Sequence, residues 1–490
     1  MKNQDLVDYL KECGVCLFCQ LRYLKARGNE YQNKQEYFEK VNVLYEEDSG
    51  CIEYAPTNKK KRRNVCPTCL DLFSDDFRDQ LLLSISSTDI GKYDCDGIVI
   101  AMSIPIILQL RQLSMWYALI DKFGDNVSLD RTPDVSLKEA IKLILNPTIC
   151  EKLKKSYDIN NGLMVTINLS HSQEEEGITR LEKLNNIVNP RKRGEKYEKI
   201  SRSLIERKYT PARVSSELFK EIFDVPPLIS NEGLKFDSIS LLGPSVYVAG
   251  RYRKISRKLS HTPWVLNGER VMDDSIEEII NRNIANYFCS DPKKVNFMSS
   301  GREDVDVRCL GAGRPFVLEI PNALQSSLNS EKARQMEDNI DKSQKVSVRD
   351  IQMVKREDLS HIKMGEEHKR KCYRALCQIG SVATIDMLRK LDLQQGFEIQ
   401  QKTPIRVLHR RPLHTRPRTV YSLKASVCQQ NKCLIILDIV TQAGTYIKEL
   451  VHGEFGRTIP SVASLLGQPI DIVALDVMEI DLDWPPSISV

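Results

Sequence analysis

Three acids, two arginines and a turn glycine stand together in the eight residues from Gly301 to Arg308. Val305 and Val307 alternate there with charged residues, which predicts a strand that begins just after Asp304. Asp304 would then lie where a loop meets a strand, and its carboxylate could project into a cleft. A carboxylate held in this way can act as a nucleophile or carry a proton. The alternative is a solvated cluster of surface ion pairs, which contributes little energy.

Four segments of the chain resemble motifs of the Pus-ten type of tRNA pseudouridine synthase, a eukaryotic and archaeal family. They are GREDVDVRCLGAGRPFVLEIPN, GEEHKRKCYRALC, TPIRVLHRRPL and QAGTYIKELVHGEFGRT, and they stand in the family's order. The stretch from Arg251 to Trp264 is similar to a further family segment, R-Y-x-K-x-S-R-x-x-x-x-T-P-W. The resemblance is densest from about residue 240 to 485 and thinner in the first half. It implies an enzyme that isomerises uridine in RNA and needs no organic cofactor.

The resemblance implies roles for the acids of the first motif. Asp304 matches the catalytic aspartate, and Gly-Arg-x-Asp also resembles the motif of the TruA branch of these enzymes. This carboxylate must be ionised near C1′ or C2′ of the sugar, so a cationic neighbour is expected. Asp306, two residues further on, ranks second as the candidate carboxylate.

The last motif supplies the cation that the resemblance implies. TruB-type enzymes carry Gly-Thr-Tyr-Ile-Arg, whose arginine pairs with the aspartate, and this chain has Lys448 in that place. Lysine lacks the bidentate fork of arginine. Tyr373 matches the family's Lys-x-Tyr tyrosine, whose ring can stack on a flipped uracil and whose hydroxyl could move a proton. Tyr446 is expected to form a wall of the pocket, and Leu466 packs either below the base or in the core.

Basic residues near these motifs are the candidates for contacts with RNA phosphates, which dominate nucleic-acid affinity. They are Arg302, Arg251, Arg253, Lys254, Arg406, Arg410 and Arg411. Further basic islands stand at 59–63 and 191–193, and ordinary solvated charge is the alternative for any single island. His409 and His452 receive no catalytic role, because the family's reaction uses the carboxylate. His452 is expected to be structural, at the start of a helix.

Length and composition set wide bounds. The 490 residues predict about three domains at ~150 residues each. A composition of 41% hydrophobic and 28% charged residues is typical of a soluble globular protein, and the net charge of +5 does not by itself indicate nucleic-acid binding. The N-terminus lacks the apolar stretch of a signal peptide, and the longest apolar run, Gly97 to Leu108, is too short to span a bilayer. We expect no membrane partner and a reducing compartment, nuclear or cytoplasmic or both, with 59–63 as a candidate import signal.

Two Cys-x-x-Cys pairs, Cys16 with Cys19 and Cys66 with Cys69, predict a structural zinc site. Four thiolates suit tetrahedral Zn²⁺, and a closed shell of four cysteines leaves no open position for catalysis. The pairs lie further apart than in compact zinc sites, which an inserted loop from Arg27 to Arg63 would explain. Cys13 competes as a ligand because Cys13-Gly-Val-Cys16 has the same spacing, and a redox role is the other alternative. The family resemblance also implies paired cysteine knuckles here.

The pattern of segments predicts an α+β chain with three regions. Residues 1–90 form the zinc-binding region, 91–236 an RNA-binding domain similar to the THUMP type, and 237–490 the catalytic domain. The catalytic domain is expected to hold a mixed, mainly antiparallel central sheet flanked by helices. Residues 322–346 are polar and predict an irregular arm. The other expected elements are strands at 97–103, 162–169, 247–253, 373–377 and 434–440, and helices at 106–119 and 275–288.

Together these features predict an RNA pseudouridine synthase. The resemblance implies tRNA as the substrate, at uridine 54 of the TΨC arm with uridine 55 as a second candidate, and other small RNAs as further partners. The first rival is a non-catalytic RNA-binding factor in small-RNA processing. The second is a zinc-dependent RNA deaminase, which is poorly supported because no His-x-Glu precedes the Cys66 pair.

Overall fold

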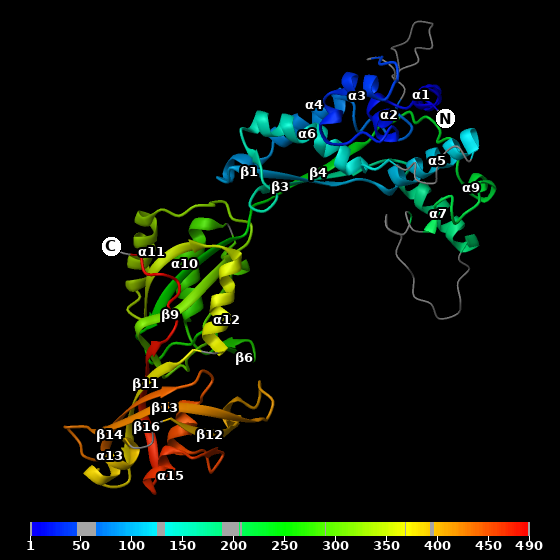
Figure 1. Cartoon of the computed structure of the whole chain (residues 1–490). Coiled ribbons are helices and arrows are strands. Elements are labelled where there is room, and N and C mark those ends of the chain that lie inside the picture. Colours follow the sequence, from blue (N-terminus) through cyan, green and yellow to red (C-terminus); the bar gives the residue numbers. More distant parts are fainter. Residues whose placement is uncertain are drawn as a thin grey trace. The chain divides into compact units, whose positions relative to one another are not determined.

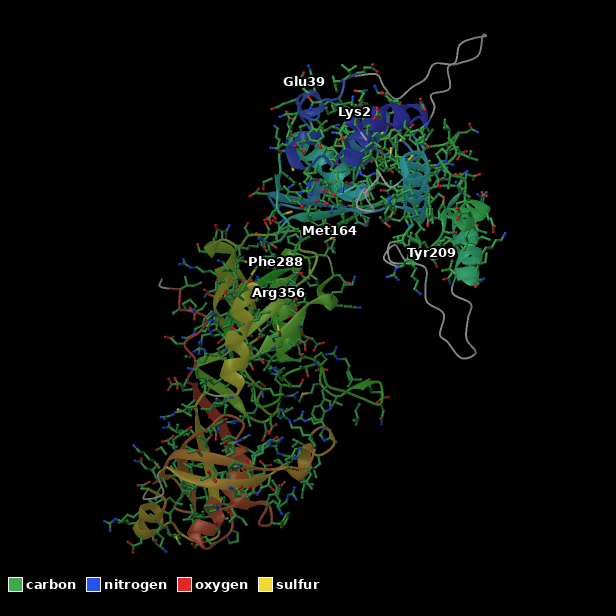
Figure 2. All side chains as sticks on the ribbon, turned by 45° about the vertical axis from the view of Figure 1, so that its right-hand side comes forward. Lys2, Glu39, Met164, Tyr209, Phe288 and Arg356 are labelled. Carbon is green, nitrogen blue, oxygen red and sulfur yellow. The ribbon has the colours of Figure 1, made fainter. Side chains whose placement is uncertain are left out.

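A computed structural model of the chain describes residues 2–46, 65–124, 133–188, 205, 208–289, 291–367, 369–392 and 396–488. It divides into two compact units, Met1–Gly243 and Pro244–Val490 (Figure 1). Each unit has its own buried side chains, such as Tyr209 in the first and Phe288 in the second (Figure 2). The basic islands at 59–63 and 191–193 lie outside the described residues.

The first unit contains a four-stranded sheet in the order β2-β1-β3-β4. Strand β1 runs parallel to β2 and β3, and β4 is antiparallel to β3. Its helices and strands are α1 (Asn3–Glu12), α2 (Leu17–Tyr23), η1 (Gly28–Tyr31), α3 (Lys34–Lys40), α4 (Asp75–Ser86), η2 (Asp89–Lys92), β1 (Gly97–Ser103), α5 (Ile106–Phe123), α6 (Leu137–Leu153), β2 (Ser156–Tyr157), β3 (Leu163–Ser170), α7 (Glu174–Val188), α9 (Ser216–Ile222) and β4 (Lys235–Leu242).

One hydrophobic core joins the two regions that the sequence separates near residue 90. It runs from Leu6 to Phe223 and includes side chains of α1, α4, β1 and α5. The expected boundary between 236 and 237 falls inside β4, whose pairing with β3 keeps it in the first unit. The segment from Arg27 is not a plain insertion, because its described part folds into η1 and α3 and buries Tyr31 and Phe38.

The second unit is built on a ten-stranded sheet in the order β10-β5-β9-β16-β11-β14-β13-β12-β15, with β8 paired to β9. Only β9 and β16 run parallel among these described pairs, so the sheet is mixed and mainly antiparallel, as predicted. Its elements are β5 (Val246–Lys254), β6 (Val265–Leu266), β7 (Glu269–Arg270), α10 (Ile276–Phe288), η4 (Pro292–Lys294), β8 (Asn296–Ser299), β9 (Arg308–Ile320), α11 (Ser330–Asp341), β10 (Val346–Val354), η5 (Arg356–Asp358), α12 (Leu359–Glu367), β11 (Lys371–Ile379), α13 (Ile385–Asp392), β12 (Phe397–Lys402), η6 (Ile405–Val407), β13 (Thr415–Val427), β14 (Leu434–Thr441), α14 (Ile447–His452), β15 (Thr458–Ile459), α15 (Val462–Leu466) and β16 (Ile470–Ile480).

The elements with clear periodicity lie where the sequence predicts them. The expected strands at 97–103, 162–169, 247–253, 373–377 and 434–440 correspond to β1, β3, β5, β11 and β14, and the expected helices to α5 and α10. Ser275 caps α10, since its hydroxyl accepts a hydrogen bond from the backbone N–H of Glu278. Helices α10 and α11 pack on the β5–β9–β10 part of the sheet, and α13 and α14 on the β13–β16 part.

Two predictions about local structure are wrong. Residues 322–346 include a helix, α11, because Ala333, Met336 and Ile340 form one apolar face that is buried beside β10. The segment after Asp304 is a turn and not a strand, and β9 begins at Arg308. The backbone N–H of Val307 donates to the carbonyl of Asp304 at 3.1 Å, which closes this turn.

Among the described residues, the helices all fall short of the length and apolar character that a membrane crossing needs.

Candidate active site

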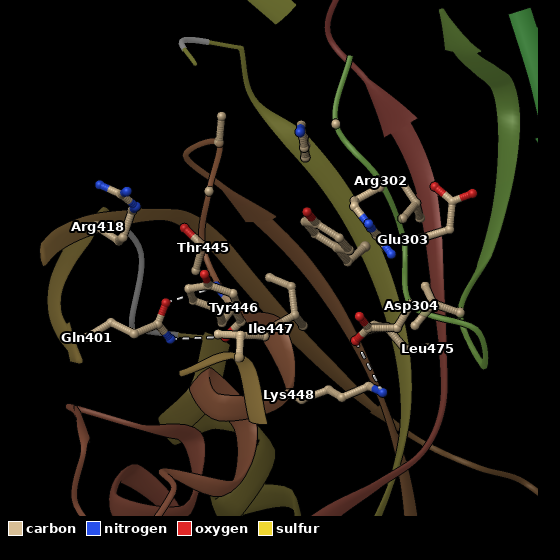
Figure 3. A pocket seen from close by; sticks show the side chains of 18 of the residues that line it. Arg302, Glu303, Asp304, Gln401, Arg418, Thr445, Tyr446, Ile447, Lys448 and Leu475 are labelled. Carbon is tan, nitrogen blue, oxygen red and sulfur yellow. Dashed lines mark hydrogen bonds and ion pairs between the residues drawn. The ribbon is translucent and has the colours of Figure 1, made fainter. Parts of the chain in front are cut away.

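A cavity of about 750 Å³ in the second unit brings together most of the predicted site residues (Figure 3). The loop before β9, strand β11, the 401–418 segment and the loop into α14 form its walls. Asp304, Tyr373 and Lys448 all line it, so three residues far apart in the sequence share one space. The other predicted residues that line it are Arg302, Arg406, Arg410, Arg411 and Tyr446.

The Asp304 carboxylate lies between two cations. Arg406 Nη1 is 2.9 Å from Asp304 Oδ2, and Lys448 Nζ is 3.5 Å from the same oxygen. Lys448 therefore lies beside the aspartate, as expected, but Arg406 is the closer partner. The sequence predicts that Arg406 contacts RNA phosphates, because nothing in the linear order connects it with residue 304.

Asp306 shares the Lys448 cation with Asp304. Its two oxygens lie 2.9 and 2.8 Å from Lys448 Nζ. Burial favours the neutral acid, but the hydrogen bond from Lys448 holds the pKa of Asp306 below its usual value. The turn at 304–307 therefore presents two carboxylates to one ammonium group.

Buried charged side chains fix the loop that carries Asp304. Glu303 and Arg314 form an ion pair of 3.0 Å with side chains 1% and 2% exposed, and Arg314 also donates to the carbonyl of Ser300 at 2.7 Å. Lys254 is fully buried, and its ammonium donates to the carbonyls of Asp304, Val305 and Val307 at 2.8, 2.6 and 2.8 Å. Burial lowers the pKa of Lys254 to about 8. The prediction that Lys254 binds RNA is wrong, since its donors are used to fix the loop that carries Asp304.

Arg251 also proves to be structural. Its guanidinium is buried and donates to four carbonyls, those of Ala312, Gly313, Leu482 and Trp484, at 2.8–3.2 Å. These acceptors belong to β9 and to the segment after β16. Arg253, two residues further along β5, is exposed, so it remains a candidate for a contact with RNA. Neither Arg253 nor Arg251 lines the cavity.

This contrast predicts opposite effects of two neighbouring substitutions. Arg251→Met should leave buried carbonyls without donors and lower the free energy of unfolding by about 3 kcal/mol. The expected fall in Tm is about 5–10 °C for a unit of this size. Arg253→Met should leave Tm unchanged and weaken tRNA binding. Thermal unfolding and filter binding of the two variants check the assignment, and a loss of tRNA affinity in a stable Arg251→Met would contradict it.

His261 belongs to the same buried network. Its Nδ1 lies 3.3 Å from the Tyr252 hydroxyl and its Nε2 3.2 Å from Ser299 Oγ. The Tyr252 hydroxyl also donates to Glu303 at 3.2 Å. Burial lowers the pKa of His261 to about 4, so the ring is neutral near pH 7.

This histidine predicts acid sensitivity. Between pH 6.5 and 4 the unfolded chain binds a proton at His261 that the folded chain does not bind, so stability falls as the pH falls. The loss amounts to about 3 kcal/mol, from a pKa difference of about 2.5 at 1.36 kcal/mol per unit. Denaturant unfolding at several pH values checks this. The variant His261→Gln should lose that part of the pH dependence, and an unchanged profile would exclude His261 as its source.

Aromatic and apolar residues complete the cavity. Burial raises the pKa of Tyr373 to about 12, so its phenol stays neutral. The backbone of Tyr446 is clamped by Gln401, which accepts from its N–H at 2.9 Å and donates to its carbonyl at 3.0 Å (Figure 3). Tyr446 is therefore a positioned wall residue. Leu466 lies in the hydrophobic core and not among the described lining residues, where Leu475 and Val477 supply aliphatic surface.

Cations dominate the cavity wall, which sequence reasoning had seen only in part. Arg416 and Arg418 line it at the end of the basic segment that begins at Arg406, where contacts with RNA phosphates are expected. Arg314 and Lys371 also line it and lie within the motif segments, but they were not predicted as site residues. Nor was Glu449, which directly follows Lys448 and contacts Arg406. Glu303 and Asp304 are the acids of the described lining, so the cavity suits an anionic ligand. The two histidines lie elsewhere: His409 is exposed, and His452 ends α14 where a helix start was expected.

The first unit holds the predicted cysteine cluster. The Sγ atoms of Cys16, Cys19, Cys66 and Cys69 all lie within 4.8 Å of one another. A tetrahedron with Zn–S bonds of ~2.3 Å requires S···S distances of about 3.8 Å, and Cys16 and Cys69 are 3.7 Å apart. Cys13 is not part of the cluster; its thiol faces Tyr9 instead. These four thiols could therefore hold a metal ion.

Comparisons with known proteins agree with this geometry. The family model described as "Pus10, C-terminal" matches residues 247–481, and "Eukaryotic Pus10, N-terminal" matches residues 65–240. A Pus10 protein of Drosophila melanogaster is 55% identical over 100% of this chain and 99% of its own length. The tRNA pseudouridine synthases Pus10 of Xenopus laevis and Homo sapiens are 36% and 33% identical over 98% and 93% of this chain, and 93% and 86% of theirs.

These matches define the class of protein as a tRNA pseudouridine synthase, an isomerase. Within that class, the chain belongs to the Pus10 family. Solved structures resemble it only weakly. A chain from the crystal structure of the archaeal box H/ACA sRNP Nop10-Cbf5 complex has 16% identity and a TM-score of 0.24, with 47% of each chain covered.

Proposed function

We propose that the chain converts uridine 54 in the TΨC arm of tRNA to pseudouridine, with uridine 55 as a second candidate, and that Asp304 is its catalytic carboxylate. One observation carries this proposal. A partly exposed carboxylate, a neutral tyrosine and two cations line the same cavity in a member of the Pus10 family. The cavity is large enough for a nucleotide that has been flipped out of the RNA stack.

The arrangement suits the steps of the isomerisation. The N1–C1′ bond breaks, the uracil turns within the site, and C5 bonds to C1′. C5 then loses its hydrogen as a proton and N1 takes up a proton, so that the product is an isomer of uridine. Asp304 would attack C1′ or take a proton from C2′, and Arg406 and Lys448 lie beside its carboxylate. The ring of Tyr373 would stack on the uracil, and Tyr446 would limit its movement. Protein side chains supply all of these roles, so the proposal needs no organic cofactor.

The surrounding cations would bind the RNA backbone. Arg302, Arg410 and Arg411 line the cavity, and Arg410 and Arg411 are exposed. Guanidinium groups match phosphates in geometry and charge, and each one neutralised adds salt-dependent affinity. This mode of binding reads little sequence, so it fits other small RNAs besides tRNA as further ligands.

For the first unit we propose a structural Zn²⁺ held by Cys16, Cys19, Cys66 and Cys69. Three of these thiols are buried and all four face one point, which suits a closed zinc site.

We also propose that the domain built on β1–β4 binds RNA in the manner of a THUMP-type domain, and that the protein works in the nucleus, the cytoplasm or both. Fluorescent tagging of the full chain checks the compartment, and exclusion from both would contradict it.

The decisive experiment incubates the full chain with an unmodified tRNA transcript and maps pseudouridine along it. Matched transcripts with cytidine at position 54, at position 55 or at both assign the product to a site. We expect product at 54 that disappears with the 54 substitution. A chain that binds tRNA yet forms no pseudouridine in any transcript would contradict the proposal and favour a non-catalytic RNA-binding factor.

A further inference from the structure

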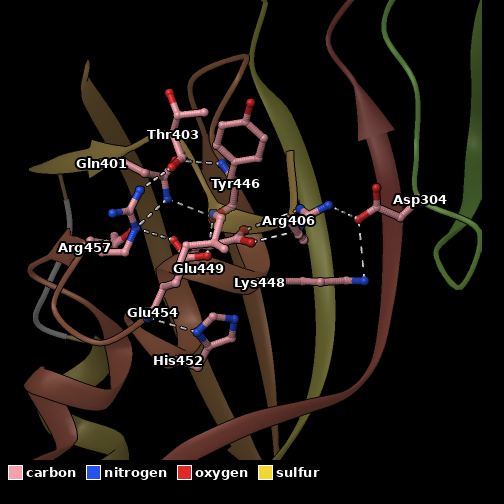
Figure 4. A network of polar contacts seen from close by, with 12 residues as sticks. Asp304, Gln401, Thr403, Arg406, Tyr446, Lys448, Glu449, His452, Glu454 and Arg457 are labelled. Carbon is pink, nitrogen blue, oxygen red and sulfur yellow. Dashed lines mark hydrogen bonds and ion pairs between the residues drawn. The ribbon is translucent and has the colours of Figure 1, made fainter. Parts of the chain in front are cut away.

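Arg406 lies between two carboxylates that come from different parts of the fold (Figure 4). Its Nη1 is 2.9 Å from Asp304 Oδ2, and its Nε is 2.7 Å from Glu449 Oε1. A second nitrogen, Nη2, lies 3.5 Å from Glu449 Oε2. One planar guanidinium thus bridges the loop before β9 and helix α14. Only arginine offers donors in such a fork.

Glu449 is the buried partner of Arg406. It is 1% exposed, whereas the side chain of Asp304 is 34% exposed and that of Arg406 is 38% exposed. A buried carboxylate is costly unless a cation pairs with it, so Glu449 holds the guanidinium strongly. Burial opposes the charge of Arg406, yet the hydrogen bond and charge of Glu449 raise the pKa of Arg406 above its usual value.

The backbone around Arg406 is held from the same side. Glu454 accepts from the backbone N–H of Ile405 at 2.9 Å, and Arg457 donates to the carbonyl of Thr403 at 2.6 Å. The Thr403 hydroxyl donates to the carbonyl of Pro412 at 2.9 Å and closes the base of the 404–411 loop. Both the backbone and the guanidinium of Arg406 are therefore placed before any ligand binds.

Arg406 is the closer of the two cations at Asp304. Its Nη1 lies 2.9 Å from Oδ2, whereas Lys448 Nζ lies 3.5 Å from the same oxygen. Lys448 lies closer to Asp306 than to Asp304. Arg406 is thus the cation that fixes the rotation of the Asp304 carboxylate.

From these contacts we propose that Arg406 is the positioning residue of the catalytic carboxylate, and that buried Glu449 acts only through Arg406. This inference rests on the proposed function of Asp304. It takes Arg406 out of the set of simple phosphate contacts, and it makes Glu449 a residue that affects the chemical step without touching RNA.

The test separates tRNA binding from chemistry. Full-length wild type and the variants Arg406→Gln, Arg406→Lys and Glu449→Gln are compared by single-turnover pseudouridine formation at saturating tRNA, with the Kd for tRNA measured separately. Misplacement of a reacting group by ~1 Å can reduce a rate about 100-fold. We expect Arg406→Gln to be about 100-fold slower and Glu449→Gln about 10-fold slower, with the Kd of Glu449→Gln unchanged. The double variant should be no slower than Arg406→Gln, because both act along one chain of contacts.

Arg406→Lys distinguishes positioning from a phosphate contact. Lysine keeps the charge, so a phosphate role predicts a rate and a Kd near those of wild type, whereas the bridge predicts a rate at least about 10-fold lower. The matched control is Arg374→Gln. It removes an exposed ion pair between Arg374 on β11 and Asp438 on β14, and it should change neither quantity. Arg406→Lys keeps a cation beside buried Glu449, so this variant should fold even if Glu449→Gln or Arg406→Gln does not.

The outcomes separate this inference from the function on which it rests. A folded wild type that forms no pseudouridine contradicts the proposed function. An active wild type together with an Arg406→Lys variant of unchanged rate overturns only the positioning role. The positioning role is also overturned if the fold-losses in rate of Glu449→Gln and Arg406→Gln multiply in the double variant, since the two substitutions would then act independently.

Discussion

Asp304→Asn should abolish pseudouridine formation, with a fall in single-turnover rate of at least about 1,000-fold. The amide keeps the size of the carboxylate but has no charge with which to attack C1′ or accept a proton. tRNA binding should survive, because the cavity loses one of its two acids and keeps all of its cations. The protein should also stay folded, since Asp304 is 34% exposed and the loop is held through backbone carbonyls by Lys254. Mapping of product and filter binding on the same sample measure both quantities.

Asp306→Asn is the matched control for that experiment. It removes a carboxylate two residues away that contacts the same Lys448, with its side chain 64% exposed. We expect a loss of less than about 10-fold, because Arg406 still holds Asp304. Full activity of Asp304→Asn combined with an inactive Asp306→Asn would transfer the catalytic role to Asp306.

Cys66→Ser should remove the bound metal and unfold the first unit. The free energy of binding structural zinc is about 10–16 kcal/mol in small zinc domains, more than most domains have as total stability. Cys66 and Cys69 also belong to the core of this unit, so the chain around them depends on the same contacts. Metal analysis of the purified protein and its far-UV circular dichroism, with and without a chelator, check this result.

Cys13→Ser is the control, because Cys13 has the same spacing to Cys16 but lies outside the cluster. It should keep one equivalent of metal and wild-type stability. Metal retained by Cys66→Ser and lost by Cys13→Ser would show that the ligand set is different. In chelated protein whose second unit stays folded, the chemical step should not change, since the cysteines lie in the first unit and the candidate active site in the second.

The sequence predicts the strands and helices whose patterns depend on local periodicity. β1, β11 and β14 alternate or run apolar over their length, and α10 has both an apolar face and a capping serine. These signals need no knowledge of distant residues, since burial of one face selects the element. The Cys-x-x-Cys pairs have the same property within each pair, although their meeting across the chain is a tertiary fact.

The turn at Asp304 shows where this reasoning stops. Val305 and Val307 alternate with charged residues as in a strand, yet three carbonyls of residues 304–307 converge on the ammonium of Lys254. An extended strand points successive carbonyls in opposite directions, so it could not satisfy that single donor. A buried lysine about 50 positions away thus decides the local backbone, and no window of sequence around Asp304 contains it.

The sequence by itself determined the family, the identity of the candidate carboxylate and the motifs that form the cavity. The tertiary structure alone decided which basic residue serves which anion. The residue type and position of Arg251 and Lys254 predict contacts with RNA. In the structure both side chains are buried and donate hydrogen bonds to backbone carbonyls instead. Arg406 became the partner of Asp304 because a buried Glu449 fixes it there. The physical reason is that a charge identifies only what a side chain can bind, whereas burial and the nearest acceptor decide what it does bind.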